Sequence, residues 1–214
     1  IMLKKLFVFL SFLLCANVSY SKNDAYLELL RDYDEALYKV RYEEDQKKLL
    51  IKLSQKATAL VNQYPKDAAI KAWTGIIFAA ESKYYTLNLY KANNRKNKAI
   101  QFLEQAKSMD ANLQKGIIYT SLGLLYLEKS GDKFDQLSKE YLLQSIRLDP
   151  QGLESNFAYA KYLFKKKKYL ETLKHLALAT DAPLRSDRKR ADKRIKFEVR
   201  QFVDKVKIQL EQKS

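Results

Sequence analysis

Residues 119–150 read YTSLGLLYLEKSGDKFDQLSKEYLLQSIRLDP, and the spacing of the large and small residues in this stretch is helical. Most of its key residues lie three or four positions apart: Tyr119, Leu122, Gly123 and Tyr126 in the first half, and Ser138, Leu142, Ser145 and Pro150 in the second. A glycine inside a helix costs about 1 kcal/mol relative to alanine, so Gly123 indicates a place where two helices cross closely. The stretch therefore predicts two antiparallel helices.

The closing pattern of this stretch, with offsets of 0, 4, 7 and 12, occurs at three further places. The corresponding residues are Leu53, Ala57, Leu60 and Pro65, then Ala99, Leu103, Ala106 and Ala111, then Thr172, Leu176, Ala179 and Leu184. This pattern and the Leu-Gly pair are typical of the tetratricopeptide repeat, a two-helix hairpin that needs about three copies to build a continuous core. We therefore predict an all-α fold, a solenoid of about four tetratricopeptide-type hairpins.

Composition divides the chain into a signal peptide over 1–21, a degenerate first repeat over 22–66, three repeats over 67–182 and a basic helix over 183–214. The last part has eleven basic and five acidic residues and an apolar stripe formed by Ile195, Val199, Phe202 and Val206. A terminal helix of this kind favours a role as a cap on the open end of the array. The alternative is a basic amphipathic helix that lies on a membrane surface.

The first of the three repeats begins with Trp73, the only tryptophan, and is about ten residues longer than the standard unit. The extra residues fall in 82–97, and the large ones among them are Tyr84, Tyr85, Leu87, Leu89 and Tyr90. We expect the turn at Asn93 and Asn94. Either this insertion lengthens a helix that covers a neighbouring repeat, or it forms the wall of a ligand cavity or a docking surface.

The first 21 residues have the pattern of a cleavable secretory signal. Lys4 and Lys5 precede an apolar run, Leu6 to Cys15, and a polar segment with small residues at Ser19 and Ser21 follows. The run is shorter than the roughly 20 apolar residues that a membrane-spanning helix needs. We expect cleavage before Lys22 and an exported, periplasmic protein. A lipid anchor on Cys15 is disfavoured, because a bulky leucine precedes that cysteine.

The formal net charge is +15, and it is +13 once the two signal-peptide lysines are subtracted. Strong basicity alone would suggest nucleic acid or an anionic membrane as partner. However, 31 of the 40 basic residues are lysine, whereas arginine is the residue that suits phosphate recognition. We therefore do not expect a nucleic-acid partner.

Few residues in the chain are suited to catalysis. His175 is the only histidine, and no cluster of histidine, cysteine and carboxylate residues has the spacing of a metal site. No glycine-rich phosphate loop and no nucleophile beside a base stands out. We therefore expect a protein that is not an enzyme and that has no cofactor and no metal.

Binding remains as the function, and stacked hairpins offer a concave surface lined by their first helices. In the repeat register, the residues expected there are Thr74, Phe78, Thr120, Leu124, Leu127, Phe157, Lys161 and Phe164, together with Tyr84, Tyr85 and Tyr90 of the insertion. This set is mostly apolar with a few polar groups, which is typical of sites for small ligands or peptides.

Several segments together resemble one family, the periplasmic tetratricopeptide T-components of tripartite ATP-independent (TRAP) transporters. They are WTGII from Trp73, the long insertion before Lys98, GIIYTSLGLLYLE over 116–128, LDPQGLESNFAYAKYLF over 148–164 and APLRSDRKRADKR over 182–194. The resemblance implies an exported all-helical protein that can form homo-oligomers. It also implies a substrate-binding component as partner and a tunnel for an apolar ligand.

Two functions stay open from the sequence. One is an exported adaptor that docks a protein partner, such as the binding component of a transporter. The other is a carrier that itself binds a small apolar ligand. We expect a closed, aromatic-lined cavity in the second case and an open groove in the first.

Overall fold

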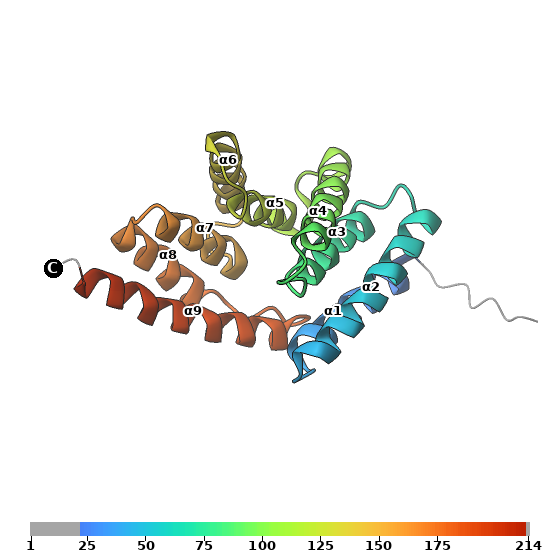
Figure 1. Cartoon of the computed structure of the whole chain (residues 1–214), viewed down its shortest axis with the longest axis horizontal. Coiled ribbons are helices and arrows are strands. Elements are labelled where there is room, and N and C mark those ends of the chain that lie inside the picture. The colour runs from blue at the N-terminus through green and yellow to red at the C-terminus, as the bar shows by residue number, and fades with distance from the viewer. Residues whose placement is uncertain (1–21, 213–214) are drawn as a thin grey trace, which may run out of the picture.

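A computed structural model describes residues 22–212, in which the chain forms α-helices, one short 3-10 helix and turns (Figure 1). In chain order the elements are α1 (Lys22–Tyr38), α2 (Glu43–Gln63), α3 (Ala68–Ser82), α4 (Leu89–Met109), η1 (Leu113–Gly116), α5 (Ile117–Leu127), α6 (Asp132–Leu148), α7 (Leu153–Lys165), α8 (Tyr169–Asp181) and α9 (Lys189–Glu211). The expected signal peptide and Cys15 lie outside the described residues.

Consecutive helices pack as pairs, α1 with α2, α3 with α4, α5 with α6, and α7 with α8. Strands are absent from residues 22–212. The all-α helical-repeat fold expected from the sequence is therefore confirmed. One apolar core runs from α1 to α5, and a second joins α7, α8 and α9.

Two glycines let paired helices approach each other closely. A Cβ atom built at Gly123 of α5 would lie 2.5 Å from Leu142 Cγ of α6, and one built at Gly75 of α3 would lie 2.7 Å from Leu103 Cγ of α4. A hydrogen bond also joins the first pair, because Ser138 Oγ donates to the Gly123 carbonyl oxygen at 2.9 Å. Gly75 and Gly123 therefore hold equivalent places in two successive repeats.

The insertion mainly lengthens α4, which has 21 residues against 15 in α3. The chain turns at residues 83–88, and Asn88 caps the new helix because its Oδ1 accepts from the Lys91 backbone N–H at 2.9 Å. The turn expected at Asn93 and Asn94 is wrong. Both side chains lie on the exposed face of α4, where asparagine remains solvated within a helix.

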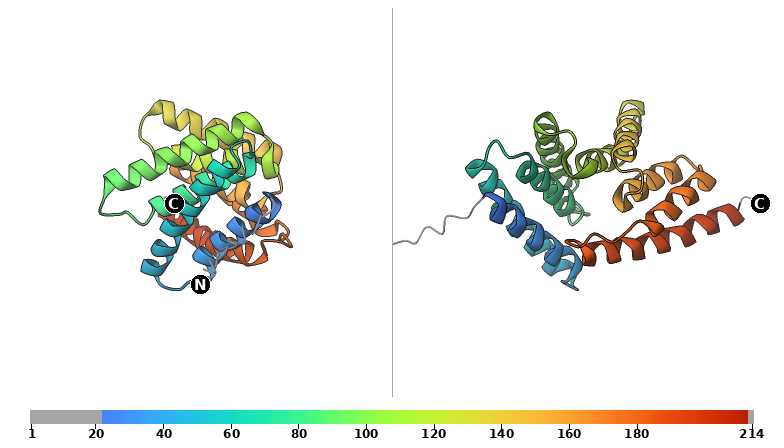
Figure 2. Two further views of the ribbon diagram at one scale, coloured as in Figure 1. Left: turned by 90° about the vertical axis from the view of Figure 1, so that its right-hand side faces the viewer. Right: turned by 180° about the vertical axis from the view of Figure 1, so that it is seen from behind.

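Helix α9 does more than cover the last repeat. Its residues Ile195, Val199 and Val206 are buried in the core shared with α7 and α8. The helix begins beside α1 and runs from there along α7 and α8 toward the C-terminus (Figures 1 and 2). The first and last helices therefore meet, and the array closes into a ring.

None of the helices in residues 22–212 combines the length and the apolar character required to span a bilayer.

Candidate functional site

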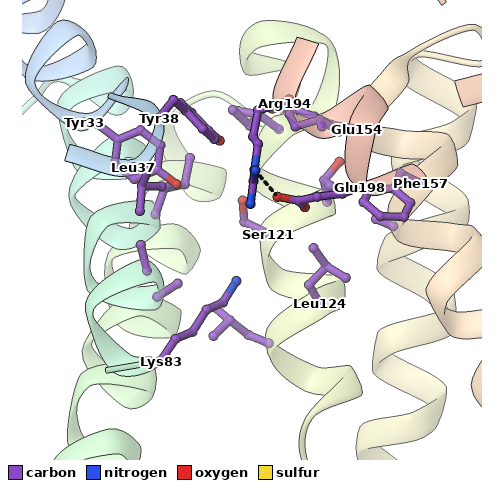
Figure 3. A pocket seen from close by; sticks show the side chains of 18 of the residues that line it. Tyr33, Leu37, Tyr38, Lys83, Ser121, Leu124, Glu154, Phe157, Arg194 and Glu198 are labelled. Atoms are coloured by element: carbon purple, nitrogen blue, oxygen red, sulfur yellow. Dashed lines mark ion pairs between the residues drawn. The ribbon is translucent and has the colours of Figure 1, made fainter. Parts of the chain in front are cut away.

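The ring surrounds a cavity of about 820 Å³. Its wall consists mainly of the first helices of the four pairs, α1, α3, α5 and α7, and α9 completes it. Figure 3 shows side chains from these helices pointing toward one another across the cavity. The first helices face inward, as in other repeat arrays, and here the C-terminal helix bounds the concave side, so that the cavity is half open to solvent.

Arg188 joins three parts of the ring at the start of α9. Its Nη2 donates to Asp34 Oδ1 of α1 at 2.7 Å, and its Nη1 donates to Glu154 Oε1 of α7 at 3.3 Å. The guanidinium also lies 4.9 Å from the ring centroid of Trp73 in α3. Burial alone would lower the pKa of Arg188, but Asp34 and Glu154 outweigh it and raise the pKa, so this cation stays charged.

The contacts of Arg188 with Asp34, Glu154 and Trp73 are called the joint below. Arg185 extends this joint by pairing with two carboxylates. Its Nη2 donates to Asp192 Oδ1 at 2.6 Å, and its Nη1 donates to Glu154 Oε2 at 3.1 Å. Asp192 is fully buried and also accepts the Arg185 backbone N–H at 2.7 Å. Glu154 is therefore shared by two arginines, which fixes the first turn of α9 against α7.

The cavity wall combines apolar side chains with hydroxyls and charges. Leu124 and Phe157 supply apolar surface, and Ser121 and Tyr38 supply hydroxyls (Figure 3). Burial raises the pKa of Tyr38, so its phenol stays protonated. The remaining charged lining includes one ion pair within α9, Arg194 Nε to Glu198 Oε1 at 3.4 Å (Figure 3).

Lys161 differs from these paired charges. Its Nζ lies 3.9 Å from the ring centroid of Phe157, one turn earlier on α7, and it forms no ion pair with a carboxylate among the described residues. Burial, and then the positive charge of Lys83, lower the pKa of Lys161 to about 8. The site therefore contains a cation that lacks a protein counter-charge.

The cavity brings together six of the residues that the sequence proposed for the concave surface. They are Tyr84, Thr120, Leu124, Leu127, Phe157 and Lys161. Tyr84 is the only one of the three insertion tyrosines that lines the cavity, and its hydroxyl donates to Gln46 Oε1 of α2 at 2.8 Å.

The structure places Thr74 and Phe78 away from the cavity. The hydroxyl of Thr74 donates to the Ile70 carbonyl oxygen of its own helix at 2.7 Å, and Phe78 stacks on Phe102 of α4 with ring centroids 5.7 Å apart. The cause is the repeat register. Since Gly75 corresponds to Gly123, the inward positions of α3 are Trp73 and Ile76, which correspond to Ser121 and Leu124.

Three more proposed residues also lie elsewhere. The hydroxyl of Tyr85 donates to Glu81 Oε1 at 2.8 Å, while Tyr90 projects into solvent at 80% exposure. Phe164 belongs to the core between α7 and α9, where its ring centroid lies 5.0 Å from that of Phe202.

The residues proposed as structural residues of the repeats lie at interfaces between helices, except for one that lies in a turn. Trp73, Leu122 and Gly123 are buried. Tyr119 and Tyr126 both lie against the ring of Tyr141 in α6, with centroids 5.9 and 5.7 Å away. Pro150 is exposed in the turn between α6 and α7.

The sequence interpretation missed the charged residues of the joint and of the cavity, namely Asp34, Lys83, Glu154, Arg188, Arg194 and Glu198. One signal was present. Five of the nine arginines of this lysine-rich chain lie in residues 185–200. Arginine suits fixed, bidentate ion pairs, so its concentration there indicated a structured joint instead of a merely solvated basic tail.

In the part of the chain that the structure describes, no three histidine, cysteine, aspartate or glutamate side chains lie close enough together to hold a metal ion. His175 lies outside the cavity, and its Nδ1 is 2.8 Å from Asn156 Oδ1 in a hydrogen bond. Burial lowers the pKa of His175, so it is neutral near pH 7.

Comparison with known proteins adds little to this description. The chain matches no protein-family model, and it matches no curated protein. Among solved structures, it is similar to one titled "Functional Characterization of Pseudomonas Aeruginosa pilF", with 18% sequence identity and a TM-score of 0.36. That alignment covers 89% of this chain and 92% of the other. At this level of similarity, no conclusion on function passes from one chain to the other.

Proposed function

We propose that this protein is a non-catalytic binding protein whose central cavity takes a small ligand with an apolar body. The observation that carries this proposal is the contact between the start of α9 and α1, which bounds a half-open cavity of about 820 Å³ between the first helices. Cavities of about 300–1,000 Å³ are typical of small-molecule sites. An open array would instead leave a long groove for an extended peptide.

The lining supports binding more than catalysis. Leu124, Phe157 and Ile76 form apolar surface, while Ser121 and Tyr38 are the kind of sparse polar groups that orient a ligand. A hydroxyl nucleophile needs an adjacent base, and the described lining contains no histidine beside Ser121.

A cavity-filling variant tests this proposal. Ala79 lies on the cavity wall, so Ala79→Phe should abolish saturable binding of a neutral apolar fluorophore such as Nile red. Ala177→Phe, on the exposed face of α8, is the matched control and should bind the dye as the wild type does. Equal dye binding by wild type and Ala79→Phe, with both variants folded by thermal melting, would contradict the proposal.

The second candidate is an adaptor that docks a protein. It is favoured by three exposed apolar side chains at the α3–α4 turn, where Leu87 is fully exposed, Leu89 is 72% exposed and Tyr90 is 80% exposed. Neighbouring exposed apolar residues often mark contact sites. Under this proposal, the substrate-binding component of a transporter of the TRAP type would be a partner of this surface.

Export to the periplasm is proposed on the sequence of residues 1–21 alone. If the segment is a cleaved signal, the intact mass of the protein isolated from its native host should match a chain that begins near Lys22. A chain that begins with a lipid-bearing Cys15 would instead identify a lipoprotein.

A further inference from the structure

The cavity contains two ammonium groups that the protein itself does not neutralise. Lys161, on α7, and Lys83, at the end of α3, both line it, and neither forms an ion pair with a described carboxylate. Figure 3 shows the amine of Lys83 directed into the cavity, opposite the joint that contains Glu154. Placing a charge in a partly buried site is unfavourable unless an opposite charge accompanies it.

Three of the four carboxylates that line the cavity have cationic partners, and the fourth, Glu43, is exposed at the start of α2 and forms no ion pair with a described residue. Glu154 accepts from Arg185 and Arg188, and Glu198 pairs with Arg194. Glu128 Oε2 pairs with Lys96 Nζ of α4 at 2.6 Å. The cations of the joint are thus balanced, whereas the positive charge on the α7 wall is not.

We propose that the cavity binds an organic anion, with its carboxylate on Lys161 and its apolar body against Leu124 and Phe157. Lys83 adds attraction from the opposite side. This inference rests on the proposed function and names the chemical class of its ligand. Phe157 serves both parts, because its ring holds Lys161 from one side and offers apolar surface to the cavity.

The titration of Lys161 is consistent with this assignment. The charged groups that influence it from the neighbouring elements are Lys83 of the α3–α4 turn, Glu128 at the end of α5 and Glu198 of α9. Burial and Lys83 together outweigh the two glutamates and lower its pKa to about 8. A bound carboxylate stabilises the charged amine, so anion binding above pH 8 should be accompanied by uptake of a proton.

The experiment compares three ligands that share one apolar chain, decanoate, 1-decanol and decylammonium. Binding is measured by titration calorimetry and by the fluorescence of Trp73, the only tryptophan, which lines the cavity. A charge-assisted contact typically contributes about 1.5–3 kcal/mol, so decanoate should bind roughly 10- to 100-fold more tightly than 1-decanol. Decylammonium should bind most weakly.

The variant Lys161→Met keeps a similar apolar stem and removes the charge. It should lose the preference for decanoate and retain the affinity for 1-decanol. Lys174→Met, on the exposed face of α8, is the matched control and should behave as the wild type. Calorimetry at pH 9 in two buffers of different ionisation enthalpy should detect proton uptake with decanoate in the wild type and none in Lys161→Met.

Each contrary result has a distinct meaning. Equal binding of decanoate and 1-decanol would overturn the anion inference and leave the small-ligand proposal standing, as would the tightest binding by decylammonium. A decanoate preference that survives Lys161→Met would show that Lys161 is not the anion site. Binding of none of the three ligands would overturn the inference and the small-ligand proposal together.

Discussion

Two contacts hold this molecule together in different ways, the crossing of α5 on α6 and the joint between α9 and α1. The first places Gly123 against Leu142, 19 residues later in the chain, and consists of buried apolar atoms. The second places Arg188 against Asp34, 154 residues earlier in the chain, and consists of ion pairs. The difference separates two tasks: local packing forms the repeats, and distant ion pairs close the ring around the cavity.

These two contacts should also respond differently to substitution. Packing inside a repeat contributes to the stability of a whole hairpin and of its neighbours, because a repeat array is stabilised by nearest-neighbour interfaces. The joint at Arg188 connects the two ends of the array and is not part of the packing inside any hairpin. Damage to the first contact should unfold the array, and damage to the second should open it.

Gly123→Leu should have the largest effect on stability. The new side chain would begin 2.5 Å from Leu142 Cγ and 3.3 Å from the Leu142 backbone nitrogen, so α5 and α6 must separate. We expect a loss of about 3 kcal/mol, the upper end of the range for overpacked cores. Chemical denaturation measures this, with Ala177→Leu on exposed α8 as a control that changes stability by less than about 0.5 kcal/mol.

Arg188→Met should have the second largest effect and should act at the joint. Asp34 loses its partner there, while Glu154 keeps Arg185. We expect a loss of roughly 2 kcal/mol, below the range for fully buried pairs because Asp34 and Glu154 are partly exposed.

Amide hydrogen exchange distinguishes opening of the ring from general unfolding. In Arg188→Met, exchange should become faster in α1 and in the first turn of α9 and stay unchanged in α5 and α6. Uniformly faster exchange over all repeats would contradict the separation of the two tasks.

Lys161→Met should alter the pH dependence of stability. The folded-state pKa of about 8 lies below the ordinary value of 10.5, so between these pH values the unfolded chain binds more protons at this residue than the folded chain does. Stability therefore rises with pH across this window, by roughly 2 kcal/mol between pH 7 and pH 9.5. Urea denaturation should show this rise in the wild type and in Lys174→Met, and a flat profile in Lys161→Met would identify Lys161 as its source.

Replacing Leu87 and Tyr90 by serine should have the smallest effect on stability. Both side chains are exposed, so the free energy of unfolding should change by less than about 0.5 kcal/mol. If the adaptor proposal holds, the same variant should lose measurable affinity for a purified substrate-binding component of a TRAP-type transporter from the same host. Unchanged affinity would assign the partner to another surface.

Much of the fold was predictable because it depends on local spacing. The offsets around Leu103, Leu142 and Leu176 determine one apolar face on each second helix, and in the structure these three helices pack mainly against the helix that precedes them. The turn after α3 was not predictable from the same signals. Asn88 caps α4, whereas the more conspicuous Asn93 and Asn94 remain on a solvated helix face, and the preference of asparagine for turns does not distinguish these cases.

The cavity was predictable only in part. Leu124, Phe157 and Lys161 could be assigned to the concave side because their helices keep the repeat register. In α3 the prominent Trp73 suggested a register two residues away from the one that Gly75 imposes by its contact with Leu103, so Phe78 was proposed in place of Ile76. The rotation of α3 about its axis decides which of its residues point into the cavity. That rotation is set by the packing of α3 against α4, which a single sequence indicates only indirectly.

The sequence by itself determined the pairs of helices, their order and the amphipathic character of the last helix, because each depends on periodicity within about 30 residues. Only the tertiary structure decided that the array closes and that its cavity keeps an unpaired cation. Closure depends on the distance between Arg188 and Asp34 after four hairpins have stacked, and small rotations between repeats accumulate to set that distance. The environment of Lys161 is also tertiary, since the charged residues that act on it, Lys83, Glu128 and Glu198, come from three other parts of the chain.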